Sequence, residues 1–404
     1  MANTINTIKD GPGIFAKGIA ETLRDNLVLC NFVEKADKSD FDGKNGFKAD
    51  DTIYTSIPPR YVPQQDNLDI TSSIQDTVEE KKPLTLNKTE TVGMKLDSLE
   101  LATDIDVATA LKRHGIPAAE AIAQNMESRC FGIVKNAVYN SVGTSGSNAF
   151  GVSDILAART KLNQNLCRPN DRGLFMTSAS GALAVDARKG LFNNQVSIGE
   201  SYTNGMIAKK TDGFDWYETE LINTHANSAD VTGAETDGAT AEGASSLTVT
   251  GLSVAPTEGT VFTLEGVYKV NPITKTTTSE LQQFVVGSGA TTTNIPVSPS
   301  LYAGSDGLQN ISALPADDTA ITFVGAASTA YEQNIAMHKT AFKMVTVPMY
   351  SPKGVDLVAT QTVDGITVNL VRDFDVLTRE VITRLDVLYG FDAVRPEWAV
   401  RITA

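Results

Sequence analysis

The feature that most constrains this chain is a break in composition between Lys210 and Lys339. The segment between these two residues contains no arginine and only two lysines, Lys269 and Lys275, and it is rich in Thr, Ala, Gly and Ser. The sequence on either side has the composition of a mixed α/β chain. The break predicts that one domain is inserted into the body of another, so the N- and C-terminal parts must meet in one core.

Length and charge limit the classes of protein to which the chain can belong. With 404 residues, 41% hydrophobic and 20% charged, it is long enough for two or three globular domains. Acidic residues outnumber basic ones by 48 to 34, for a net charge of −14. Tight sequence-independent binding to nucleic acid relies on clustered Lys and Arg, so we do not expect it. We interpret the acidity as an aid to solubility.

The sequence shows no recognisable export or membrane signal. Its first residues lack a basic region followed by an apolar run, so they do not predict a signal peptide. No apolar stretch approaches the roughly 20 residues that cross a bilayer. Cys30, Cys130 and Cys167 are widely separated and lack the paired spacing of zinc or redox motifs. We expect reduced thiols, no disulfide and no bound metal in a cytoplasmic product.

Two segments have the apolar spacing of helices. Phe15, Ile19 and Leu23 recur at four-residue steps and predict an amphipathic helix that packs through this stripe. Pro117 is expected to open a longer helix that runs to about Ser141. At 1.5 Å per residue, about 25 residues make a rod of roughly 37 Å, which suits a structural spine.

Strand-like segments between these helices predict an extended hairpin. Thr52–Ile57 has the composition of a strand that Pro58 and Pro59 stop, and a second alternating run covers Leu84–Leu96. The sequence between them is long and polar. An isolated hairpin is marginal in water, so this one needs a partner surface, which we expect on another subunit.

After the long helix the pattern becomes α/β and then β. Helices are expected over Val152–Leu162 and Ala182–Leu191, with a buried strand at Gly173–Thr177. Short β segments separated by Gly, Pro, Asn and Ser fill the insert and predict a small closed sheet or barrel that stabilises the subunit. These segments are Leu247–Thr250, Val261–Leu264, Gln283–Val286 and Ile321–Val324. Beyond Phe342 the chain is again strand-like, with Val381–Tyr389 the longest candidate.

No set of residues forms a recognisable catalytic, cofactor or metal motif. The three histidines are isolated in sequence, so each is assigned a structural or surface role. Gly143–Ser147 and Ser178–Gly181 lack the Gly-x-Ser-x-Gly pattern and are expected to be loops. The acidic pairs Asp50–Asp51 and Asp317–Asp318 lack His or Cys partners, and we interpret them as solvated charge rather than a calcium site. We therefore predict no enzyme activity, no catalytic residue and no cofactor.

Three motifs are informative through their order and spacing. They are Leu84–Lys88, Asp212–Tyr217, and Thr383–Gly390 followed by Arg395–Glu397. Taken together, they resemble the major capsid proteins of tailed bacteriophages with the Hong Kong 97 fold. The most similar subgroup is the coat proteins that carry an inserted β-domain, as in the Salmonella podovirus type, and the resemblance runs over nearly the whole chain.

This resemblance implies a layout for the chain. The fold would be α+β of the Hong Kong 97 type, with a small β-barrel-like domain inserted into it. In chain order, the parts are an N-terminal arm (1–37), an E-loop (38–97), a peripheral domain with a spine helix (98–149), an axial domain (150–222), the insertion β-domain (223–330), the continued axial domain (331–365) and returning peripheral strands (366–404).

The resemblance also implies a function and partners. The chain would self-assemble as hexamers and pentamers into the icosahedral shell around a double-stranded DNA genome, in a virion assembled in the host cytoplasm. Expected partners are further copies of itself, a separately encoded scaffolding protein, a portal protein, a decoration protein and packaged DNA bound without sequence specificity, but no membrane. Arg60 and Tyr61 would contact a neighbouring subunit from the E-loop; a solvent-exposed loop tip is the open alternative for both.

Two other classes of protein stay open on the sequence alone. The acidic insert, rich in Thr and Ala, is also compatible with a secreted surface-layer or adhesin-type structural protein. The missing signal peptide argues against that class. A hydrolase with an unrecognised site is the third class, and it lacks any supporting motif.

Overall fold

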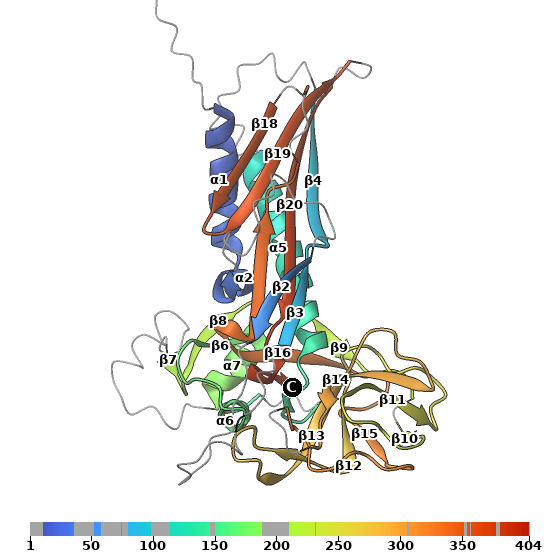
Figure 1. The fold of residues 1–404 in the computed structure, drawn as a ribbon. Helices are drawn as coiled ribbons and strands as arrows, with labels where there is room; N and C mark the ends of the chain where they lie inside the picture. The colour runs from blue at the N-terminus through green and yellow to red at the C-terminus, as the bar shows by residue number, and fades with distance from the viewer. Residues whose placement is uncertain are drawn as a thin grey trace, which may run out of the picture. The chain divides into compact units, whose positions relative to one another are not determined.

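The computed structural model describes residues 11–35, 52–57, 74, 80–97, 114–145, 150–187, 210–230, 232–304, 308–350, 354–355, 357–376 and 380–403. The chain divides into two compact units (Figure 1). Unit 1 comprises Met1–Thr55, Pro83–Cys130 and Lys343–Asp392. Unit 2 comprises Ser56–Lys82, Phe131–Phe342 and Ala393–Ala404. Each unit is therefore assembled from segments far apart in the sequence.

Unit 1 is built on a six-stranded sheet with the order β1-β17-β20-β19-β18, to which β4 adds by pairing with β20. The strands are β1 (Glu34–Lys35), β4 (Lys88–Asp97), β17 (Phe342–Val347), β18 (Leu357–Val363), β19 (Ile366–Asp375) and β20 (Glu380–Ala393). Strand β20 is antiparallel to both β4 and β19, and it contains the predicted strand Val381–Tyr389. It therefore joins the N-terminal and C-terminal parts of the chain in one sheet.

Helix α1 (Gly11–Asn26) confirms the helix predicted from the spacing of Phe15, Ile19 and Leu23. It packs against β18 and β19 (Figure 1). The side chains of Ile19 and Leu23 are fully buried. The side chain of Phe15 lies outside the described residues. A short helix, α2 (Leu29–Phe32), follows α1.

The predicted hairpin is only partly right. Strand β2 (Thr52–Ile57) does pair with β3 (Glu80–Thr85) in a two-stranded sheet. The run Leu84–Leu96 is not one strand, however, because β3 ends at Thr85 and β4 begins at Lys88. The two halves serve different sheets, since β4 pairs with β20 over ten residues. The polar stretch between β2 and β3 lies outside the described residues, apart from Ile74.

Unit 2 contains a seven-stranded sheet with the order β5-β21-β16-β6-β8-β7, in which β9 also pairs with β16. The strands are β5 (Ser141–Val142), β6 (Arg172–Met176), β7 (Lys210–Thr211), β8 (Phe214–Glu218), β9 (Thr224–Ala226), β16 (Ala330–His338) and β21 (Ala399–Thr403). Helices α6 (Val152–Gln164) and α7 (Ser178–Asp186) belong to the same unit.

The long helix is shorter than its spacing predicted. Helix α5 runs over Ile116–Ala137, not to Ser141. Ser141 instead begins β5 and pairs with Arg401 of β21. The side-chain amide of Asn140 donates to the carbonyl of Ala399 at 3.1 Å. This pairing with the C-terminal strand, which has no local signal in the sequence, ends the helix.

The segment Ser178–Gly181 is not the loop that we expected. It forms the first turn of α7, which begins four residues before the predicted start at Ala182. Thr177 caps this helix, because its hydroxyl accepts a hydrogen bond from the backbone N–H of Ser180 at 3.2 Å.

The insert forms a sheet of its own with the order β10-β11-β14-β13-β12-β15. Its strands are β10 (Glu235–Thr236), β11 (Ala244–Thr250), β12 (Val261–Val270), β13 (Thr277–Val286), β14 (Asn294–Leu301) and β15 (Ile321–Phe323). The sheet closes on itself, because Glu235 bridges Ala320 and the backbone N–H of Ile321 donates to the carbonyl of Ala234 at 2.8 Å. The predicted β-barrel-like domain is thus confirmed.

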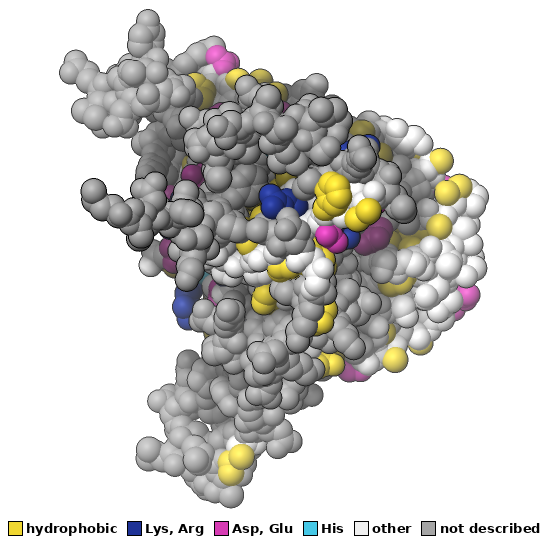
Figure 2. All heavy atoms as spheres, turned by 90° about the horizontal axis from the view of Figure 1, so that it is seen from above, with side chains coloured by type: hydrophobic (Ala, Val, Ile, Leu, Met, Phe, Trp, Pro, Cys, Tyr) yellow, Lys and Arg dark blue, Asp and Glu magenta, His cyan; other side chains and the backbone are white. Residues whose placement is uncertain are grey.

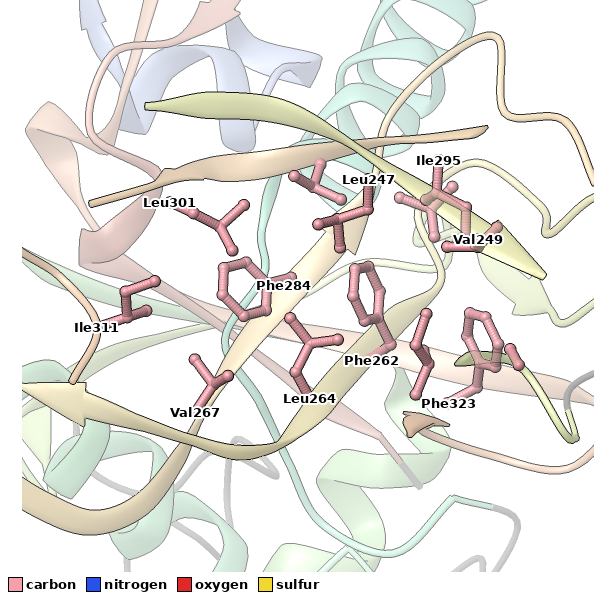
Figure 3. Packing of buried hydrophobic residues seen from close by; sticks show 14 residues of the cluster. Leu247, Val249, Phe262, Leu264, Val267, Phe284, Ile295, Leu301, Ile311 and Phe323 are labelled. Atoms are coloured by element: carbon pink, nitrogen blue, oxygen red, sulfur yellow. The ribbon is translucent and has the colours of Figure 1, made fainter. Parts of the chain in front are cut away.

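A cluster of buried hydrophobic residues fills the interior of this barrel. Phe262 lies at its centre, with ring centroids 5.7 Å from Phe284 and 5.9 Å from Phe323 (Figure 3). Leu, Val and Ile side chains from all the larger strands complete a cluster of buried residues around these rings. The alternation of apolar and polar residues along β11 directs Leu247 and Val249 inward and the threonines outward.

Candidate functional site

The predicted inter-subunit residues Arg60 and Tyr61 lie outside the described residues, and their role stays a prediction.

Within unit 1, α1 is held at its end by an ion pair from Arg24 Nη1 to Asp364 Oδ2 at 3.0 Å. This pair is largely exposed, and such pairs contribute little to stability. The buried stripe of α1 therefore supplies most of its attachment.

Two of the informative motifs meet in unit 1. Lys88 pairs with Tyr389 in the β4–β20 ladder, so the ends of Leu84–Lys88 and Thr383–Gly390 lie side by side. Leu84, Leu86 and Leu388 pack in one cluster of buried residues with Val345 and Val347. A Cβ atom on Gly390 would lie 3.0 Å from the carbonyl oxygen of Thr85, so only glycine fits there without a shift.

A buried carboxylate organises the polar side of this contact. Glu90 accepts hydrogen bonds from Arg129 Nη1 and from the Tyr389 hydroxyl, both at 3.1 Å, and from the side-chain amide of Asn125. Burial raises the pKa of Tyr389 above its ordinary value, and the nearby Cys130 and Glu90 add to the effect. A carboxylate with three donors is satisfied, so this cluster fixes β4, α5 and β20 in one register.

A second buried carboxylate joins α2 to α5. The sequence placed Glu127 off the apolar stripe of the long helix, yet its side chain is fully buried. Its carboxylate caps α2 by accepting from the backbone N–H groups of Val28, at 2.9 Å, and of Leu29. Burial raises the pKa of Glu127 despite these two donors.

Beside this cap the structure brings together two cysteines that the sequence separates. The sulfur atoms of Cys30 in α2 and Cys130 in α5 lie 3.7 Å apart, and both residues are fully buried and free. The wide separation of the cysteines in the sequence therefore gave no indication of this contact. No spacing rule could have found it, because 100 residues separate the two positions.

The motif Asp212–Tyr217 forms a tight hairpin turn in unit 2. Asp212 and Gly213 have φ values of 57° and 89°, the left-handed conformation that a two-residue turn between β7 and β8 requires. The indole N–H of Trp216 donates to the carbonyl of Thr211 at 3.2 Å. Tyr217 stacks on Phe175 with ring centroids 5.1 Å apart. The motif is therefore structural.

The motif Arg395–Glu397 has a similar role at the entry to β21. The guanidinium of Arg395 lies 4.4 Å from the centroid of the Trp398 ring. The carbonyl of Glu397 accepts from the side-chain amide of Asn165 at 2.8 Å and from that of Asn140 at 3.3 Å. These contacts bring the C-terminal strand against the ends of α5 and α6.

Within unit 2, polar contacts attach the barrel to the larger sheet. Gln283 and Ser141 exchange two hydrogen bonds of 2.9 Å between the Gln283 side chain and the Ser141 backbone. Lys161 pairs with Glu280 at 2.8 Å. Arg401 Nη1 donates to the carbonyl of Gly259 at 2.8 Å. The barrel thus has an apolar interior and a polar attachment.

Three cationic or titratable groups in unit 2 are buried without full pairing. Burial lowers the pKa of Arg401 to about 9. Burial, followed by the charges of Arg401 and Lys135, lowers the pKa of His225 to about 3, so this histidine is neutral at physiological pH. Burial also lowers the pKa of Lys269 to about 8, and its Nζ has no hydrogen-bond partner among the described residues. Such groups often mark chemistry. His225 and Arg401 interact with each other, whereas the charged neighbours of Lys269 are Lys161 and Glu280.

The described part of the chain offers no cluster of three or more His, Cys, Asp or Glu residues that could hold a metal ion. Of the two acidic pairs, Asp50–Asp51 lies outside the described residues. Asp317 has a local role, since its carboxylate accepts from the backbone N–H of Gly238 at 2.6 Å. None of the described helices is long and apolar enough to cross a membrane.

Large apolar side chains reach the surface at separate points of unit 1. Tyr54 is 65% exposed, Tyr350 71% and Val376 78%. Figure 2 shows that hydrophobic, acidic and basic side chains are interspersed on the face that it views, among the described residues. Single exposed apolar residues are normal on a monomer, so these positions are candidates for contact rather than a defined patch.

Comparison with known proteins identifies the family. Residues 5–403 match the family described as P22 coat protein, gene protein 5. The chain belongs to the P22 coat protein family. It is a major capsid protein of a bacteriophage, a structural component of the virion, and its α+β fold is the Hong Kong 97-like fold of phage capsids. The match gives no support to the surface-layer or adhesin alternative.

Several solved structures also align with this chain at low sequence identity. The Mycobacterium phage Che8 structure is 10% identical, covers 93% of this chain and 90% of its own, and has a TM-score of 0.46. The capsid of Ralstonia phage GP4 is 8% identical, with 93% and 87% covered and a TM-score of 0.47. The CUS-3 coat protein I-domain is 26% identical, with 23% and 96% covered and a TM-score of 0.18. The assignment rests on the family match. No curated protein matches the chain.

Proposed function

We propose that this coat protein assembles as hexamers and pentamers into an icosahedral shell around double-stranded DNA. The observation that carries the proposal is the family match over residues 5–403. The partners are further copies of the chain, a separately encoded scaffolding protein, a portal protein and a decoration protein. The net charge of −14 supports contact with packaged DNA that is weak and independent of sequence.

The layout expected from the sequence belongs to the same proposal. The N-terminal arm covers residues 1–37, and the E-loop covers 38–97. Peripheral, axial and insertion domains follow as stated above, with the insertion at 223–330. The division between the two compact units at Phe342 and Lys343 falls inside the proposed second axial segment, 331–365. In this layout the sheets stabilise the subunit, and the N-terminal arm and the E-loop provide the contacts between subunits.

The E-loop supplies the contact that can be tested most sharply. Strands β2 and β3 form a separate two-stranded sheet, and Tyr54 of β2 is 65% exposed. A two-stranded sheet gains stability when another surface covers it. Arg60 and Tyr61 stand three and four residues after the end of β2, and Arg and Tyr are residue types that dominate interface energies.

The test is the double variant Arg60→Ala with Tyr61→Ala, measured by sedimentation velocity under assembly conditions. We expect the fraction of protein in shells to fall at least about tenfold, while the melting temperature of the free subunit stays unchanged. The matched control is Arg168→Ala with Tyr268→Ala, two exposed positions outside the E-loop that are not among the candidate contact residues. Equal shell formation by the E-loop variant and the wild type would contradict the assignment of these two residues.

A further inference from the structure

Two fully buried thiols meet where the N-terminal part of the chain lies on the long helix. The sulfur atoms of Cys30 and Cys130 are 3.7 Å apart, within unit 1. A disulfide bond is about 2.05 Å long, and side-chain rotation about the Cα–Cβ bonds brings sulfurs together over such a gap. The third cysteine, Cys167, has the carbonyl of Arg168 as its neighbour at 3.5 Å and no second thiol.

We propose that Cys30 and Cys130 form an oxidisable pair, which a small-molecule disulfide converts into an internal disulfide that fastens α2 to α5. With glutathione disulfide, the Cys30 thiolate attacks one sulfur and releases one glutathione thiol, which leaves a mixed disulfide. The Cys130 thiolate then displaces the second glutathione. Two protein thiols are oxidised, one disulfide reagent is reduced, and two glutathione thiols leave with the two protons.

The surroundings of the pair keep it reduced while α2 stays docked. Both residues are fully buried, and the positive charge of Lys35 opposes the rise in the pKa of Cys30 without reversing it. The neighbouring Cys130 thiol, together with burial, raises the pKa of Cys30 well above its ordinary value, and the charge of Glu127 adds to this. A thiol must ionise and be reached before it reacts. Oxidation therefore requires α2 to leave α5.

Glu127 controls that opening. Its carboxylate holds the backbone N–H groups of Val28 and Leu29, which stand immediately before Cys30. Loss of this cap weakens the docking of α2 without removing either cysteine. The rate of disulfide formation thus reports how often this segment lifts from the helix.

The biological consequence rests on the proposed function. A coat protein is assembled in a reducing cytoplasm and later meets an oxidising exterior, where disulfides form and persist. The bond would close a loop of 100 residues between the two positions and would fasten the segment after α1 covalently. The pair would then lock the subunit only after release from the cell.

The test incubates the full-length subunit, and separately its assembled shells, with glutathione disulfide. Non-reducing peptide mapping is expected to find the 30–130 linkage, with a melting temperature several degrees higher than that of the reduced protein. Cys30→Ser and Cys130→Ser should each abolish both effects, and Cys167→Ser should leave both intact. Glu127→Ala should speed the reaction about tenfold.

Free thiols at both positions after prolonged incubation of the Glu127→Ala variant would overturn the proposal. So would a linkage that involves Cys167. Because the subunit is tested apart from shells, a failure to assemble would count against the proposed function and would leave this readout unaffected.

Discussion

The inserted barrel and the sheet of unit 1 are stabilised by different kinds of buried residue. The barrel buries a cluster of fourteen hydrophobic residues, Phe262 among them, and that cluster includes no charged residue. Unit 1 instead combines small apolar clusters with buried carboxylates, Glu90 and Glu127, whose partners come from other elements. An apolar core tolerates the replacement of one hydrophobic side chain by another of similar size. A buried carboxylate, in contrast, is stable only with the hydrogen-bond donors that surround it. The contrast suggests that the barrel supplies stability and that unit 1 specifies the arrangement of its elements.

The largest effect is expected from opening the barrel core. Phe262→Ala removes a fully buried ring that contacts Phe284 and Phe323, and it should lower the free energy of unfolding by about 3–5 kcal/mol. Thermal unfolding of the free subunit measures this. Tyr268→Ala, on the same strand but 40% exposed, is the control and should cost much less. Equal losses of unfolding free energy in the two variants would contradict the claim that the barrel core supplies the stability.

A smaller effect is expected from the carboxylate cluster of unit 1. Glu90→Ala leaves the Tyr389 hydroxyl and the Asn125 amide without their partner, which should lower the free energy of unfolding by about 2–3 kcal/mol. Glu120→Ala, an exposed position on α5, is the matched control and should have little effect. Chemical denaturation gives both values. A variant at Glu90 that is as stable as the control would show that the cluster does not hold the register.

The smallest effect tests the exception inside the barrel domain. Lys269 is 7% exposed and its ammonium group has no partner among the described residues, so Lys269→Met should stabilise the protein by about 1 kcal/mol at pH 7. The folded-state pKa of about 8 lies below the ordinary 10.5, so the unfolded state holds the proton more tightly between these values. Stability of the wild type therefore rises from pH 8 to pH 10.5.

The advantage of the Lys269→Met variant should accordingly shrink over that pH range. Unfolding curves at about pH 7 and about pH 10 compare the two proteins on either side of the folded-state pKa. Lys275→Met, in the turn that follows β12, serves as the control. A constant difference at both pH values would show that the ammonium of Lys269 is not the source of the cost.

The local parts of this fold could be predicted from the sequence, and the contacts between distant residues could not. The alternation at Leu247–Thr250 and the four-residue steps of α1 fix each element by its own period. Glu127 shows the limit. It lies off the apolar stripe by spacing, and only the docking of α2 makes it a buried cap. The link between Ser141 and Gln283 is equally invisible, because no pattern connects residues 142 positions apart.

The central claim is that this chain builds a closed shell from copies of itself. Electron microscopy of the purified protein, expressed with and without its neighbouring genes, tests that claim most directly. We predict closed particles of uniform diameter when the assembly partners are present. Protein that stays as single subunits at every concentration tested, with or without those partners, would contradict it.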